Sequence, residues 1–256
     1  MPDSLPPFGA AFEELQELVR RCVERITPGR QGFLAWEQWS FWALEALEWR
    51  FYGVRRHYGE IYAPTLDPLR LWKLEYQLST ILFHMQSSIE TIAFALNGLG
   101  SAVEPGLFID ASKRGNRVSP LHLYSDRNGR KLQPGYAIVF PSVQRFWRQM
   151  DETALLDTLR EMHNRSKHCR MVSALGRQES LPAVSDPAIS AAAPWQDVYL
   201  WTGDGLQVPE RYCGDTGSFR LTPLVEHYVD FVNATGAAAV RDATTNILPR
   251  CVPQPG

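Results

Sequence analysis

Imidazole, amide and cationic side chains gather in one short stretch of the C-terminal half of the chain. Arg160, Asn164 and His168 recur at every fourth position, and His163 and Lys167 lie beside them. An imidazole titrates near neutral pH and can accept or donate a proton, and a cation can stabilise charge on a phosphate. These residue types suit binding or cleavage of a phosphodiester. They suit a solvated helix face equally well.

A helix is predicted over residues 151–171, and it would position these side chains. At about 100° per residue, five positions fall within about 40° of one direction and form a buried stripe. They are Leu155, Leu159, Met162, Ser166 and Cys169. Arg160, Asn164 and His168 centre about 180° from the stripe, so we expect them on the exposed face, with His163 on the flank.

The string from His163 to His168, HNRSKH, resembles the RN-x-x-x-H motif of the HEPN superfamily of helical-bundle proteins. Asn164 and His168 match the motif, whereas His163 stands where the family has arginine. Arg160, one turn earlier, or Arg165 could supply the missing guanidinium. The family includes metal-independent ribonucleases, often toxins, and also inactive members that serve as binding or dimerisation modules.

The resemblance implies a chemistry for these residues. The ribose 2′-hydroxyl would attack the adjacent phosphate, and His168 would move protons. In this chain His163 could share the acid and base roles with His168. Asn164 and Arg160 would complete the catalytic set, and Arg165 and Lys167 would bind the substrate. The resemblance implies neither a metal ion nor a cofactor.

A second polar feature lies on the long helix predicted over residues 69–99. His84 shares a stripe with Gln77, Ser88 and Thr91, which are spaced at three, four and seven residues. A polar stripe beside an apolar one is typical of a second packing surface. We therefore weigh His84 both as a substrate-binding residue and as a structural one.

The spacing of His163 and His168 along the helix bears on whether the protein forms a dimer. His163 and His168 are five residues apart, so on a straight helix they point about 140° away from each other. A bend or a partner chain would be needed to aim both at one phosphate. HEPN-like proteins are commonly dimers, so we expect a homodimer, with RNA and a cognate antitoxin protein as further partners. The alternative is a catalytically inactive helical bundle that acts in dimerisation or protein interaction.

Composition narrows the class of protein. Of 256 residues, 45% are hydrophobic and 21% are charged, as in ordinary globular proteins, and the net charge is −2. Nucleic acid could therefore be contacted only through a local basic patch. The four cysteines are spread singly without zinc-site spacing. Neither a secretory signal nor 18 consecutive apolar residues occur, so we expect a cytoplasmic protein without membrane contact.

Periodicity predicts a mainly α fold, a bundle of about five helices in a single domain over residues 11–245. The first three helices are predicted over residues 12–26, 33–58 and 69–99, the third ending at the glycines near residue 99. A fourth begins at Pro141 and leads into the cluster helix, and Thr222 would cap the last.

The connections differ in character. Residues 101–140 form a basic insert with short apolar pieces such as GLFID and YAIVF, in which short strands or an ordered excursion are expected. Residues 176–194 are expected to form a flexible linker or surface loop. The segments DVYLW and LQVPERY flank a glycine-rich turn and predict a β-hairpin before the last helix. Residues 1–10 and 246–256 are expected to be flexible tails.

Overall fold

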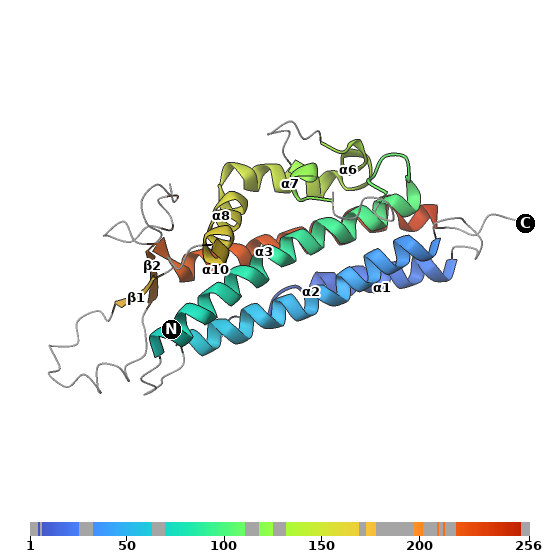
Figure 1. Cartoon of the computed structure of the whole chain (residues 1–256). Helices are drawn as coiled ribbons and strands as arrows, with labels where there is room; N and C mark the ends of the chain where they lie inside the picture. The colour runs from blue at the N-terminus through green and yellow to red at the C-terminus, as the bar shows by residue number, and fades with distance from the viewer. Residues whose placement is uncertain are drawn as a thin grey trace, which may run out of the picture. The chain divides into compact units, whose positions relative to one another are not determined.

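The computed structural model describes residues 5, 7–25, 33–62, 70–110, 118–124, 132–168, 173–177, 197–201, 209, 212 and 219–251. These residues are mainly helical, as the sequence predicts (Figure 1). The helices are α1 (Ala10–Arg25), α2 (Phe33–Tyr62), α3 (Arg70–Val103), α5 (Leu121–Tyr124), α6 (Pro134–Val139), α7 (Pro141–Glu152), α8 (Leu155–His168) and α10 (Leu221–Asn246). A 3-10 turn, η4 (Leu248–Arg250), follows α10.

Contacts divide the chain into two compact units. Unit 1 comprises Met1–Pro6, Phe51–Gln86 and Ala154–Tyr228, and unit 2 comprises Pro7–Arg50, Ser87–Thr153 and Val229–Gly256. The boundary between the units falls inside α2, α3 and α10, so each of these helices has one segment in unit 1 and one in unit 2. The sequence-based expectation of a single domain over residues 11–245 stays a prediction.

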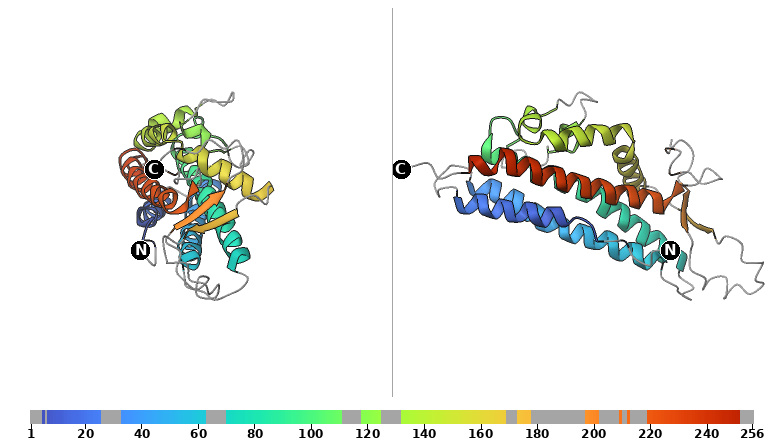
Figure 2. Two further views of the ribbon diagram at one scale, coloured as in Figure 1. Left: turned by 90° about the vertical axis from the view of Figure 1, so that its left-hand side faces the viewer. Right: turned by 180° about the vertical axis from the view of Figure 1, so that it is seen from behind.

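In unit 1, α8 buries the stripe that the sequence predicts. Leu155, Leu159 and Met162 are fully buried, and burial of apolar side chains of this size is the main force that seats an amphipathic helix. Two views show α8 beside the first half of α3 and the start of α10 (Figures 1 and 2). Ser166 is half-buried, and Cys169 lies outside the described residues.

Unit 1 also holds a small antiparallel sheet of order β1-β2-β3. Its strands are β1 (Ser173–Arg177), β2 (Asp197–Trp201) and β3 (Phe219–Arg220). Strand β2 coincides with DVYLW, the first strand of the predicted hairpin. Its described neighbours are β1 and β3, which are distant in sequence, whereas most of the predicted second strand, residues 206–212, lies outside the described residues. The predicted loop over residues 176–194 begins within β1.

Unit 2 is held together by aromatic packing and by buried hydrogen bonds. The indole Nε1 of Trp147 in α7 donates to Thr235 Oγ1 in α10 over 3.0 Å, and the Trp147 ring lies 5.1 Å from that of Phe231. Asp242 accepts hydrogen bonds from the backbone N–H groups of Ser142 and Val143, at 2.8 and 3.0 Å. Ser142 and Val143 lie at the N-terminus of α7. A carboxylate there accepts hydrogen bonds from backbone N–H groups that have no partner within the helix, and its negative charge complements the helix dipole.

The long helix α3 passes through the glycines at which it was expected to end. It continues to Val103 because these glycines serve close packing instead of capping. A Cβ on Gly98 would crowd Ser40, and a Cβ on Gly100 would overlap the ring of Phe108. Bulkier residues would therefore separate the elements packed there.

The helix predicted over residues 151–171 begins later than expected, at Leu155, and residues 151 and 152 belong to α7. Helix α7 ends at Glu152 and α8 begins at Leu155, and Ala154 between them has φ 57°. This left-handed backbone cannot continue a right-handed helix. Apolar periodicity continues across the break, which is why the sequence pattern does not show it.

Of the two alternatives for the insert, the described residues contain an ordered segment with helices and not the short strands. YAIVF lies largely in helix α6, opened by Pro134, and α5 adds a further turn of helix. GLFID is held by Asn97, whose amide donates to the Ile109 carbonyl and accepts from the Ile109 N–H. The basic residues of the insert lie outside the described residues. With α5, α6 and the division at Ala154, the described residues contain more helices than the five expected.

Both predicted tails are partly packed. Phe8 is buried, and the N–H of Gly9 donates to Asn233 Oδ1 over 3.0 Å. At the other end Ile247 and Cys251 are buried, so the ordered chain extends past residue 246. Among the helices of the described residues, none combines the length and apolar character needed to cross a membrane.

The last helix begins two residues earlier than expected, at Leu221 and not at Pro223. Thr222 therefore lies in the first turn of α10 and is not its cap. Its hydroxyl instead meets the phenol groups of Tyr62 at 2.8 Å and Tyr58 at 3.4 Å. This contact joins α10 to the second half of α2 within unit 1.

Candidate functional site

The predicted cluster lies on α8, and the structure separates its members by burial. His163 is only 5% exposed, whereas its neighbour Asn164 is exposed. Arg160 keeps 43% of its side chain exposed and pairs with Asp157, one turn earlier, over 2.7 Å. The expected exposed face is confirmed at Asn164 and half-confirmed at Arg160. His163, expected on the flank, belongs to the buried side.

The C-terminal turns of α8 carry three predicted site residues. Arg165, Lys167 and His168 are part of helix α8, but their side chains lie outside the described residues. Only their order along the helix is fixed. That order keeps His163 and His168 about 140° apart around the helix axis.

His163 is buried because α3 supplies a partner for its ring. The rings of His163 and Phe83 are 5.7 Å apart and tilted by 50°. Phe83 in turn meets His84 edge-on at 5.5 Å. Tilted and edge-on arrangements are the favourable ones for aromatic rings, so the contact stabilises the seating of α8 on α3.

The ring series continues to α2. His84 stacks on His57 with the ring centroids 5.8 Å apart and the planes 15° from parallel. Gly53 permits this approach, since a Cβ there would overlap the His84 ring. Three helices of unit 1 thus contribute to one series of contacting rings, from His57 through His84 and Phe83 to His163.

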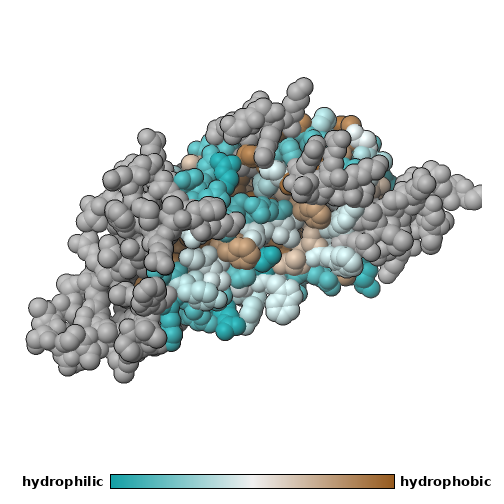
Figure 3. Space-filling model, in the orientation of Figure 1, coloured by the Kyte–Doolittle hydropathy of each residue, from teal (hydrophilic) through white to brown (hydrophobic). Residues whose placement is uncertain are grey.

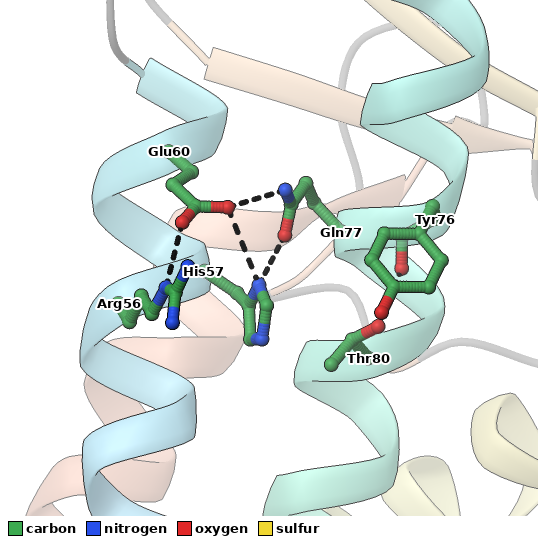
Figure 4. Close-up of polar contacts among 6 residues, drawn as sticks. All are labelled: Arg56, His57, Glu60, Tyr76, Gln77 and Thr80. Atoms are coloured by element: carbon green, nitrogen blue, oxygen red, sulfur yellow. Dashed lines mark hydrogen bonds and ion pairs between the residues drawn. The ribbon is translucent and has the colours of Figure 1, made fainter.

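A polar cluster lies at the α2 end of the ring series (Figure 4). His57 Nδ1 contacts Gln77 Oε1, and it lies 3.5 Å from a carboxylate oxygen of Glu60. Gln77 donates to the same carboxylate, and Arg56 donates to its other oxygen over 2.8 Å. The hydrogen bond from Arg56 holds the pKa of the Glu60 carboxyl below its usual range, and His57 and Gln77 lower it further.

Sequence reasoning missed several members of this arrangement. The sequence pattern singles out neither Phe83 nor His57 as a site residue. A signal for Phe83 existed, because it is a large apolar residue outside the apolar stripe of α3 and next to His84. Nothing in the spacing of α2 could indicate that His57 faces Gln77 and His84, since that depends on how two helices pack.

The chemistry of the described residues is limited. His84 and His163 have Nδ1 atoms shielded from solvent. In the described part of the chain, no three His, Cys, Asp or Glu side chains converge to hold a metal ion. The rings of the series pack against one another, and α8 presents Asn164 and part of Arg160 to solvent.

No protein-family model, curated protein or solved structure matches this chain. On the face shown in Figure 3, hydrophobic residues form separate patches among hydrophilic and neutral ones.

Proposed function

We propose that this chain is a HEPN-like protein that contacts RNA or a nucleotide through the polar face of α8. The observation that carries the proposal is that α8 buries Leu155 and Leu159 fully and keeps Asn164 exposed. A contact surface for a phosphodiester needs donors turned to solvent, and amide and guanidinium groups are suitable donors. Arg160, Arg165 and Lys167 add positive charge along the same helix.

In this proposal His163 is a structural residue and His168 is the candidate proton-transfer group. A general acid or base must reach the proton that it transfers, directly or through one water. The 5% exposure of His163 and its ring contact with Phe83 favour a packing role. If the protein cleaves RNA, it is a metal-independent endoribonuclease of toxin or defence type that depends on His168 and not on His163.

The proposal includes an assembly. A homodimer would bring a second α8 to the ligand, and a cognate antitoxin protein would be a further partner in the cytoplasm. Size-exclusion chromatography with light scattering at micromolar concentration tests the homodimer. We expect the molar mass of two chains. A strict monomer would contradict a ligand site formed by two copies of α8.

RNA binding and cleavage in the presence of EDTA test the leading proposal. A labelled single-stranded RNA is titrated with the protein and with Asn164→Ala, Arg160→Gln, His168→Ala and His163→Gln. We expect Asn164→Ala and Arg160→Gln to weaken binding with little loss of thermal stability, because Asn164 is exposed and Arg160 is half-exposed, with a surface ion pair to Asp157. His163→Gln should lower the melting temperature and leave the affinity of the folded fraction unchanged. Any cleavage should disappear in His168→Ala.

Two results would contradict the proposal. If the wild-type protein does not bind the labelled RNA, RNA is not its ligand. Cleavage abolished by His163→Gln with an unchanged melting temperature would make His163 a catalytic residue. The two readouts are independent, because thermal stability is measured without RNA.

A second candidate function is a catalytically inactive protein-interaction module. Large aromatic side chains on α2 favour it, since Trp42 is 60% exposed and Trp49 is 72% exposed. Tryptophan is enriched at the centres of protein interfaces. A change in molar mass caused by Trp49→Ser, in a protein that does not bind RNA, would favour this function over the first.

A further inference from the structure

Unit 2 carries a hollow in its surface that is distinct from the α8 cluster. The first part of α2 and the second part of α3 line it, and its volume is about 420 Å³. Pockets for small ligands commonly measure roughly 300–1,000 Å³ and combine aromatic walls with a few polar groups. Trp39, Trp42 and Phe94 supply the aromatic surface of this hollow.

One wall is accessible for stacking. Trp42 is 60% exposed, while Trp39 and Phe94 are half-buried and fix the shape of the hollow. An exposed indole face is a platform for a planar ring, and such stacking is tolerant of the identity of the ring. The aromatic wall therefore favours a flat, unsaturated ligand over an aliphatic one.

The charges that line the hollow narrow the ligand further. Among the described residues of the lining, Arg50 is positively charged and Glu90 is negatively charged. Arg50 offers N–H donors to a ligand, and Glu90 offers acceptor oxygens. A neutral ring that offers acceptors at one edge and donors at another matches both groups at once.

We propose that this hollow binds a purine base, with guanine the best match. The O6 and N7 acceptors of guanine pair with an arginine, and its N–H groups donate to a carboxylate. Arg50 would meet the acceptor edge, Glu90 would meet the donor edge, and Trp42 would stack on the ring. The base could come from a free nucleoside or from a strand of RNA. This binding site does not depend on the proposed role of α8.

Calorimetric titration of the full chain tests the proposal. Guanosine, cytidine and choline are the small probes, and a short single-stranded RNA that contains guanine is the second source of the base. Trp42→Leu removes the stacking face and should weaken guanosine binding by about tenfold. Glu90→Gln replaces the acceptor and should reduce the preference for guanosine over cytidine.

Trp49→Leu is the matched control. Trp49 lies on the same helix and is 72% exposed, but it does not line the hollow. We expect the control to bind guanosine as the wild-type protein does, with the same circular dichroism spectrum for all variants. Binding of the RNA but not of guanosine, lost in Trp42→Leu and kept in Trp49→Leu, would also support the proposal and assign the base to a strand.

Three results would overturn it. The first is the absence of heat of binding for both guanosine and the RNA at millimolar ligand. The second is equal weakening by Trp42→Leu and Trp49→Leu, which would indicate stacking on any exposed indole. The third is choline binding in place of guanosine, which would identify the hollow as a cation site. Each result is obtained without reference to the α8 variants.

Discussion

His163 is more deeply buried than its position on the α8 helix predicts. Helical geometry places it on the flank of the stripe, at the edge between core and solvent. Its 5% exposure is decided by Phe83, a residue of another helix. Leu156 and Thr158 are also buried, so the buried face of α8 is wider than the narrow stripe of the pattern. Because His163 is buried, fewer residues of the α8 cluster face solvent than the sequence pattern predicts.

Glu60 gives a prediction about pH. Arg56, and then His57 and Gln77, hold the pKa of its carboxyl below the ordinary value of 4.5. A carboxyl with a lowered pKa in the folded protein stabilises the fold above its unfolded pKa. This contribution is lost as the pH falls through the folded pKa. We expect Glu60→Gln to lower the free energy of unfolding slightly at pH 7, with the difference shrinking below pH 4.5.

Urea denaturation of both proteins between pH 3 and pH 7 would measure this effect. Glu48→Gln is the control, because Glu48 is an exposed glutamate on the same helix. A difference between Glu60→Gln and the wild type that grows toward acid would contradict the assignment. The effect should be small, since Glu60 is largely solvated and surface ion pairs are screened.

At the scale of the element, the division between α7 and α8 is set by one backbone conformation. Ala154 has φ 57°, a region that costs an L-residue roughly 1–2 kcal/mol and costs glycine little. Because this conformation does not continue α7, α8 begins as a separate helix at Leu155.

Replacing Ala154 tests the strain directly. Ala154→Gly should raise the free energy of unfolding by up to about 1 kcal/mol, because glycine adopts the left-handed conformation without a Cβ clash. The same change at Ala237, an exposed residue inside α10, should lower it by about 1 kcal/mol. Chemical denaturation measures both. Destabilisation of equal size at both positions would mean that residue 154 is helical in solution.

At the scale of the whole molecule, electrostatics limit how RNA can be held. The net charge is −2, so attraction to a polyanion must come from a local group of cations. On α8 these are Arg160, Arg165 and Lys167. The basic residues of the insert over 101–140 would add to them only if they face the same ligand.

The salt dependence of RNA binding separates these two cases. For single strands the slope of log affinity against log salt is about −0.7 per phosphate neutralised, so three cations give about −2. Arg160→Gln should make the slope shallower by about 0.7. Fluorescence anisotropy between low and physiological salt measures both values. A slope near −5 would indicate a broad basic surface and would bring in the insert.

The sequence alone determined the helical class, the positions of the long helices and the buried stripe of α8. These features follow from local periodicity, since Leu155, Leu159 and Met162 recur on one side of any helix that contains them. It also singled out the His163 to His168 string, because residue types and spacing are visible without coordinates.

Tertiary structure decided the rest, because it depends on which surfaces meet. Only the packing of α3 against α8 could bury His163 on Phe83, and only that of α2 against α3 could bring His57 to Gln77. Gly98 and Gly100 lie inside α3 because close approach of neighbouring groups outweighs their tendency to end a helix. A local pattern describes what a segment can present to its surroundings, whereas its partners come from segments remote in the chain.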